Sequence, residues 1–338
     1  MVLKSICMIR HASRAKLGDV RIQEQFSNLD ETKALRHSET PASRPVKHQP
    51  DDGLTVIGKQ QAEELARYLT QAHPDIKAVY VSKNYRCLET IKPFMEQCER
   101  TEKQVKLRFE PGLVEWKRID RVTPRPPSSS QLKKYHPKID IDHEPLCVPL
   151  GHENVDEYYD RCAYFLARLI ETMDTDPNGP ESVLLCTSAS NVVWCTRVLL
   201  GIKPGDPQEK DFMVPAIGFY KFIRKGILPV KIKPDQKNGL GYIKLDWETG
   251  TALGGSWSCT HKADCSFLSS GPIMVWGAFA TDIPAHLSPS EARKLPPSQL
   301  PNFFDIQETD AQKKTITVDN KVGSGGEFTI TTTELLVD

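Results

Sequence analysis

The sequence predicts an α/β fold of three layers, in which helices cover both faces of a doubly wound, mostly parallel sheet. Short, continuous apolar runs, typical of parallel strands buried on both faces, alternate with longer segments in which apolar residues recur at helical spacing. The first apolar run, Val2–Ile9, is too short to cross a membrane and ends abruptly at Arg10 and His11. At 338 residues, the chain can form one large domain with an appendage, or two domains.

The predicted strands and helices follow one another along residues 1–280, which we expect to form the main domain. The predicted strands are Val2–Ile9, Ile76–Val81, Val105–Phe109 and Ser182–Thr187. The predicted helices are a segment that follows Gly58 and ends near His73, then Asn84–Gln97, Asn154–Met173 and Ser190–Leu200. Residues 15–52 predict a long loop over the carboxyl edge of the sheet, and the proline-rich residues 122–149 predict an irregular insertion. A hairpin of Phe219–Ile223 and Pro229–Ile232 is predicted to follow.

The composition changes after about residue 280. Residues 281–313 are rich in proline and serine and predict a poorly ordered link. Residues 314–338 alternate apolar and polar side chains around a glycine-rich turn, which predicts a short C-terminal β-hairpin, too small to fold alone. We expect this β appendage either to pack on the edge of the main sheet or to add a strand to a partner protein.

Charge and cysteine usage exclude several classes of protein. Lysine and arginine total 44, as do aspartate and glutamate, so no overall field attracts nucleic acid or an acidic membrane. The nine cysteines are scattered without a CxxC pair, and no signal peptide or long apolar run is visible, which indicates an intracellular protein of the nucleus or cytoplasm. Cys259, His261 and Cys265 offer three ligands at a spacing that matches no usual zinc pattern, so we expect no metal and no cofactor.

Polar side chains follow the predicted strands at the points where these strands end. They are Arg10, His11, Arg14, Arg86, Glu115 and Ser188. Because the carboxyl ends of parallel strands meet at one edge of a sheet, we expect these side chains to lie together there. Guanidinium groups bind phosphate oxygens in pairs and stay charged, a histidine can attack phosphorus, and a glutamate can protonate the leaving oxygen. Arg86 and Glu115 could instead be helix-end charges paired at the surface, and their spacing alone leaves that question open.

Four strings of residues, in this order along the chain, resemble the histidine phosphatase (phosphoglycerate mutase-like) superfamily over about residues 1–280. They are Arg10-His11-Ala12, Gly53-Leu54-Thr55 leading to Gly58 and Gln61-Ala62, Ser82–Thr90, and Gly112–Trp116. The resemblance implies the histidine phosphatase fold, with His11 phosphorylated during turnover and Glu115 as the proton donor. It also implies that the phosphate pocket is formed by Arg10, Arg14 and Arg86.

Three further features resemble one branch of this superfamily more narrowly. They are Tyr85–Thr90, Glu115-Trp116 with the following Arg118 and Asp120-Arg121, and the late Phe267–Gly271. That branch is the histidine-phosphatase subunit of fungal transcription factor TFIIIC and its stand-alone fungal relatives. The resemblance implies a TFIIIC-type protein partner reached through the C-terminal β segment, although this chain has much less of that part than the subunit has. We expect no direct sequence-specific binding of nucleic acid.

The chain departs from the family's pattern at two positions. Ala12 stands in place of a glycine, a small change that the turn should tolerate if its backbone angle allows. Ser188 stands in place of the family's second catalytic histidine, and its hydroxyl is neutral and too short to replace a protonated imidazole. Losing one well-placed oxyanion donor costs about 10²- to 10³-fold in rate. His152, ahead of the long helix, is the other histidine that could fill the gap.

Two functional hypotheses follow from these residues. We expect a weak or inactive pseudoenzyme that keeps its phosphate pocket and acts as a phosphate-binding or scaffolding subunit in RNA polymerase III transcription. The alternative is an active phosphomonoesterase that works through phospho-His11. Turnover of p-nitrophenyl phosphate, compared with that of an Arg86→Ala variant, separates the two hypotheses.

Overall fold

The computed structural model describes residues 2–14, 53–117, 133, 136–137, 139–149, 151–207, 209, 211–226, 242, 244–248 and 253–273, to which all structural statements refer. Its strands are β1 (Ser5–Arg10), β2 (Ile76–Val81), β3 (Lys106–Phe109), β4 (Ile139–Asp140), β5 (Ser182–Thr187), β6 (Phe219–Arg224) and β7 (Trp257–Asp264). Its helices are α2 (Val56–Ala72), α3 (Tyr85–Arg100), α5 (Val155–Thr175) and α6 (Ala189–Leu200), with a 3-10 turn η1 at Pro111–Leu113.

One sheet connects all of these strands, in the order β4-β3-β2-β5-β1-β6-β7. Strands β1 to β5 pair in parallel, whereas β6 runs antiparallel to β1, and β7 runs antiparallel to β6. The predicted doubly wound, mostly parallel sheet is therefore confirmed, with an antiparallel edge.

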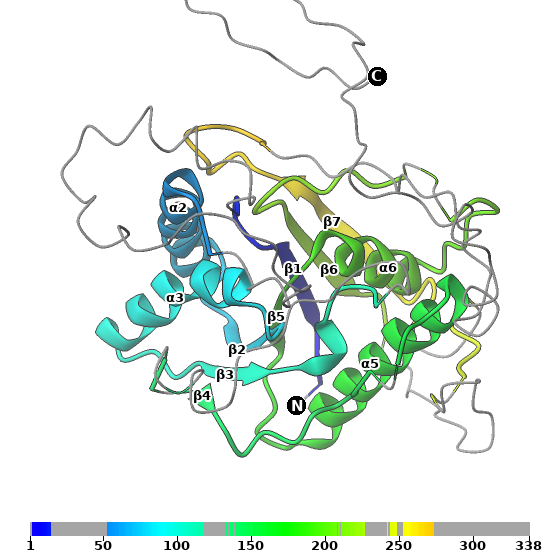
Figure 1. The fold of residues 1–338 in the computed structure, drawn as a ribbon. Coiled ribbons are helices and arrows are strands. Elements are labelled where there is room, and N and C mark those ends of the chain that lie inside the picture. Colours follow the sequence, from blue (N-terminus) through cyan, green and yellow to red (C-terminus); the bar gives the residue numbers. More distant parts are fainter. Residues whose placement is uncertain are drawn as a thin grey trace, which may run out of the picture.

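Helices cover both faces of the sheet, so the three predicted layers are present (Figure 1). Successive residues of a strand point to opposite faces, and β1 shows this directly. Ile6 and Met8 pack in the core under α5 and α6, whereas Cys7 and Ile9 pack in the core under α2 and α3. A strand covered on both sides has no polar face, which explains the continuous apolar runs in the sequence.

Local sequence signals set the ends of the helices. Asn154 caps α5 with a reciprocal pair of hydrogen bonds, since its side chain accepts from the Glu157 amide and the Glu157 carboxylate accepts from the Asn154 amide. Helix α6 ends at Gly201, whose φ of 71° is left-handed and suits glycine. These boundaries agree with the predicted ones within a few residues.

Other predictions are corrected or lie beyond the described residues. The first strand of the predicted hairpin, Phe219–Ile223, is part of β6, which lies between β1 and β7, and the second, Pro229–Ile232, lies outside the described residues. The predicted irregular insertion contains a short strand, β4, which joins the edge of the sheet at β3. The predicted link at 281–313 and hairpin at 314–338 lie outside the described residues.

Candidate functional site at the carboxyl edge of the sheet

The strand register aligns the carboxyl ends of the central strands. Arg10 of β1 lies opposite Thr187 of β5, and Val81 of β2 lies opposite Phe109 of β3. The pairing of β1 with β5 continues one residue further, because the His11 amide donates to the Thr187 carbonyl at 2.9 Å. The residues that follow these ends are therefore released at the same edge, as expected for a parallel sheet.

Arginines 10, 14 and 86 gather at this edge. Arg86 is 2% exposed and Arg10 is 7% exposed, and a nitrogen of the Arg10 guanidinium donates to the Val214 carbonyl at 2.8 Å. The pKa of Arg10 is lowered to about 10, mainly by burial and then by the positive charges of Arg14 and Arg86, while Glu115 partly offsets these effects. Arg10 therefore stays charged at neutral pH in a place where like charges repel one another. A bound anion would relieve that repulsion.

His11 is buried among these arginines and is neutral at pH 7. Burial holds its pKa well below the ordinary value, and the charges of Arg86, Arg10 and Arg14 lower the pKa further. Its Nδ1 lies 2.8 Å from the Ala12 carbonyl, which can only accept, so Nδ1 carries the proton. This tautomer leaves the lone pair of Nε2 available, as a nucleophilic imidazole requires.

The low pKa of His11 predicts a stability that falls in acid. The unfolded chain binds a proton at His11 below about pH 6.5, whereas the folded chain does not, so the free energy of unfolding declines by up to about 1.4 kcal/mol per pH unit. His11→Gln should remove that part of the slope between about pH 6.5 and pH 5. Urea unfolding of both proteins at several pH values checks this. The same dependence of the free energy of unfolding on pH in both proteins would contradict the prediction.

Ala12 adopts its turn without glycine. Non-glycine residues with a positive φ in the described part of the chain are confined to Glu102, Ile217 and Ala263, so Ala12 is not left-handed. Its amide donates to the Thr90 hydroxyl at 2.9 Å. That hydroxyl in turn donates to the Arg86 carbonyl at 2.7 Å, which ties the His11 turn to the first turn of α3.

The start of α2 holds the segment that carries Arg14. The Ser13 carbonyl accepts from both the amide and the hydroxyl of Thr55, at 3.0 and 3.2 Å, and the Ser13 amide donates to Gln61 at 3.1 Å. A Cβ at Gly58 would lie only 2.1 Å from the Ser13 carbonyl oxygen. Close backbone approach therefore requires glycine there, and it explains the spacing from Thr55 through Gly58 to Gln61 in the sequence.

Gly58→Ala should disturb the site and the fold together. The added methyl group must push the Ser13 carbonyl away, and overpacking of this kind costs about 1–3 kcal/mol. We expect weaker anion binding as well, because Arg14 moves with Ser13. Thermal unfolding and calorimetry with vanadate measure the two effects. Gly205→Ala is the matched control, since a Cβ at Gly205 meets nothing within 4 Å, and equal behaviour of the two variants would contradict the prediction.

Glu115 faces the arginines from the segment after β3. Its Oε2 lies 3.0 Å from a nitrogen of the Arg86 guanidinium, and its side chain is 42% exposed. Because Arg86 is buried, the pair is not two surface charges at helix ends, and that reading is wrong for Arg86. A half-exposed carboxylate beside a buried guanidinium can reach both solvent and a ligand.

Ser188 stands at the end of β5 as the N-terminal cap of α6. It is 2% exposed, and its hydroxyl lies 3.1 Å from the Ser190 hydroxyl and 3.4 Å from the Asn191 amide nitrogen. The hydroxyl therefore contacts side chains in the first turn of α6. His152 contacts the segment after Glu115, since its Nδ1 lies 3.3 Å from the Lys117 carbonyl.

A buried carboxylate that supports this edge was not predicted from the sequence. Glu110 is fully buried directly after β3 and accepts from the amides of Gly112, Leu146 and Cys147 and from His143. These hydrogen bonds hold the segment that leads to Glu115 in place. An acidic residue between a strand end and Pro111-Gly112 was the signal that could have revealed it.

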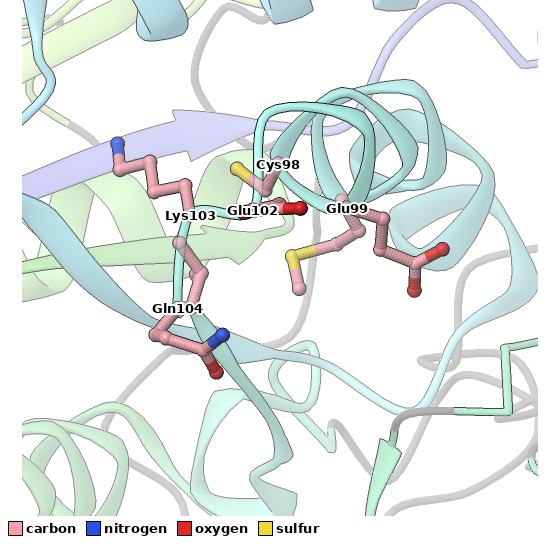
Figure 2. Close-up of a pocket in the computed structure, with 7 residues that line it drawn as sticks. Cys98, Glu99, Glu102, Lys103 and Gln104 are labelled. Carbon is pink, nitrogen blue, oxygen red and sulfur yellow. The ribbon is translucent and has the colours of Figure 1, made fainter.

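The pocket in Figure 2 lies away from these residues. It measures about 320 Å³ and is lined by the end of α3 and the residues that lead to β3, among them Cys98, Glu99 and Lys103. Cys98 is 12 residues beyond Arg86 along the same helix, which corresponds to about 18 Å. The pocket therefore opens at the amino edge of the sheet, opposite the arginines.

The described part of the chain contains neither a metal-ligand cluster nor a helix that could span a membrane. Cys259 and His261 lie on β7, and no group of three or more potential ligands that could hold a metal ion is found there or elsewhere in that part. None of the helices in the same part is both long enough and apolar enough to span a membrane.

The fold and the site together define an α/β protein with three arginines around a buried histidine at the carboxyl edge of its sheet. Residues 34–220, more than half of the chain, match the histidine phosphatase superfamily (branch 1), and the chain belongs to that superfamily. The matched range begins after Arg14 and includes Arg86, Glu115 and Ser188. The family membership expected from the sequence is confirmed.

Individual relatives are distant. The chain is 29% identical over 231 residues to human (Homo sapiens) ubiquitin-associated and SH3 domain-containing protein A, covering 64% of this chain and 34% of that protein. It is 27% identical over 295 residues to the transcription factor tau 55 kDa subunit of Saccharomyces cerevisiae, covering 82% of this chain and 64% of the subunit. The chain thus spans about a third of the first relative and under two thirds of the second.

A solved structure supports the fold. The ecdysone phosphate phosphatase from Bombyx mori, in complex with tungstate, superposes with a TM-score of 0.51 at 20% identity. The match covers 72% of this chain and 98% of that chain. At this identity the likeness concerns the fold alone.

Proposed function

We propose that this protein binds phosphate monoesters or related oxyanions through Arg10, Arg14 and Arg86 beside His11. The observation that carries the proposal is the convergence of three arginine charges on a buried, neutral histidine. Guanidinium groups remain charged and match phosphate oxygens, whereas burial among like charges is unfavourable without an anion. The tungstate in the phosphatase of similar fold fits the same class of ligand.

Turnover at this site is proposed to be weak, because Ser188 supplies neither charge nor length at the end of β5. We propose a binding or scaffolding role, in a TFIIIC-type complex of the nucleus, which the similarity to the tau 55 kDa subunit supports. Its protein partner would be reached through the C-terminal segment.

One observation favours a second candidate function, an active phosphomonoesterase. The Nδ1–H of His11 donates to the Ala12 carbonyl, which leaves Nε2 free to attack phosphorus. Glu115 lies 3.0 Å from Arg86, so its carboxyl group is close enough to an ester bound there to protonate the leaving oxygen. Hydrolysis of p-nitrophenyl phosphate by the purified protein, lost in Arg86→Ala, would establish this function. Undetectable hydrolysis with intact anion binding would leave the binding role.

Arg86→Gln should weaken the binding of vanadate by about 10- to 100-fold, since a charge-assisted hydrogen bond is worth about 1.5–3 kcal/mol. Calorimetry at low and moderate salt measures this. Arg100→Gln is the matched control, because Arg100 is an exposed residue at the far end of the same helix. The proposal fails if parent and Arg86→Gln bind vanadate equally well, or if the parent does not bind it.

A further inference from the structure

Asn191 is fully buried in the first turn of α6, and its amide reaches across to the segment that carries Glu115. Its Nδ2 donates to the Leu113 carbonyl at 2.7 Å and to the Val114 carbonyl at 2.8 Å. Val114 immediately precedes Glu115 in the chain. One side-chain amide thus contacts two consecutive carbonyls at the base of the carboxylate. The Thr187 hydroxyl, 2.9 Å from the same Nδ2, also donates to the Leu113 carbonyl, and Arg161 donates to the Val114 carbonyl at 3.1 Å.

Tyr158 of α5 orients this amide. Its hydroxyl donates to Asn191 Oδ1 at 2.8 Å, which fixes which end of the amide faces the carbonyls. The same tyrosine ring stacks on Trp116 with centroids 5.5 Å apart and planes 6° apart. Trp116 also donates its indole N–H to the Glu153 carbonyl at 2.9 Å. The residues on both sides of Glu115 are therefore held, directly or through Tyr158, by the same group of contacts.

The Glu115 side chain takes no part in that group of contacts and reaches Arg86 instead. It is 42% exposed and meets Arg86 at 3.0 Å. An anion that binds Arg86 must share this guanidinium with the Glu115 carboxylate, and the two negative charges repel each other. The strength of that competition depends on how firmly the backbone of Glu115 is held in place.

We propose that Asn191 is a positioning residue that fixes the backbone of Glu115 and thereby sets how Glu115 competes with a bound anion for Arg86. The role of the anion rests on the proposed function, whereas the positioning of Glu115 does not. Asn191 lies in the same turn as Ser188. The support of Glu115 is therefore retained although Ser188 stands in place of the family's second histidine.

A double-mutant cycle tests the proposal with vanadate as the probe. Asn191→Ala should bind vanadate about 3- to 10-fold more tightly than the parent, because a loosened Glu115 competes less well for Arg86. Glu115→Ala should bind more tightly still, and adding Asn191→Ala to it should change nothing further. Thr196→Val is the control on the same helix, since the buried Thr196 hydroxyl has no hydrogen-bond partner among the described residues.

Hydrogen exchange of the amides from Val114 to Trp116 gives a readout that needs no ligand. Asn191→Ala should speed their exchange selectively, and Thr196→Val should not. A change in vanadate affinity by the same factor with and without Glu115 would show that Asn191 acts only through general stability, and would overturn the proposal. If the parent binds no vanadate, the proposed function fails, and unchanged exchange in Asn191→Ala would then overturn the positioning role separately.

Discussion

Replacing Arg161 with alanine should lower the free energy of unfolding by about 3–5 kcal/mol, the cost of leaving a buried charge without its partner. Arg161 and Glu153 are both fully buried, and two guanidinium nitrogens meet the two carboxylate oxygens at 2.5 and 2.9 Å. The third guanidinium nitrogen donates to the Gly112 carbonyl at 2.6 Å. The variant therefore leaves the buried Glu153 carboxylate without its charged partner, although the Tyr242 hydroxyl remains 3.3 Å from one of its oxygens, and it removes the Arg161 donor from the Gly112 carbonyl.

Arg168 on the same helix provides the matched control. It pairs with Glu171 at 2.5 Å, but the two side chains are 40% and 37% exposed. Exposed pairs of this kind contribute about 0–1 kcal/mol, so Arg168→Ala should change stability little. Urea unfolding of both variants decides the matter, and similar losses for the two would contradict the buried-pair explanation. Arg161→Met combined with Glu153→Leu should recover much of the loss, because it removes both charges.

Ser188→His should raise the hydrolysis of a small aryl phosphate by about 10- to 100-fold, somewhat below the full value of one oxyanion donor. The position is already at the end of β5 beside His11, because the His11 amide is bonded to the Thr187 carbonyl. The new ring must find room next to Ser190 and Asn191, which now surround the serine hydroxyl. That crowding is the reason to expect less than the full gain.

The measurement is steady-state hydrolysis between about pH 5 and pH 7, where an ordinary imidazole is at least partly protonated. Ser188→Gln is the control, since it adds similar bulk without the positive charge and should give no comparable gain. No gain for Ser188→His, in a variant that is folded and binds vanadate as well as its parent, would show that the loss at Ser188 is not what limits turnover.

The strands, the helices and their order along the chain could be predicted from the sequence, because each signal is local. A buried parallel strand such as Ser182–Thr187 is apolar throughout, and Asn154 with Glu157 marks the start of a helix. The position of Arg10, His11 and Arg86 at one edge then followed from the general geometry of parallel sheets. Their chemical roles remain predictions.

The supports of the site could not be predicted, because they connect residues far apart in the sequence. Asn191 bonds to carbonyls 77 and 78 positions away, and Arg161 bonds to one 49 positions away. The sequence does not show which backbone carbonyls will accept a hydrogen bond from a distant side chain. Asn191 and Arg161 each read as an ordinary polar residue in an amphipathic helix, and only the packing of α5 and α6 against the turn at Pro111–Leu113 gives them their partners.

The central place of β1 in the sheet has a consequence for how the protein is made. β1 is synthesised first, but its two neighbours, β5 and β6, end only at Thr187 and Arg224. At about 5–20 residues per second, the ribosome needs roughly 10–40 s to deliver them after β1. During that interval the nascent chain presents an apolar segment whose sheet partners do not yet exist, which is the kind of segment that chaperones protect. Arg10 and His11 thus reach their environment only after β5 and β6 have been made.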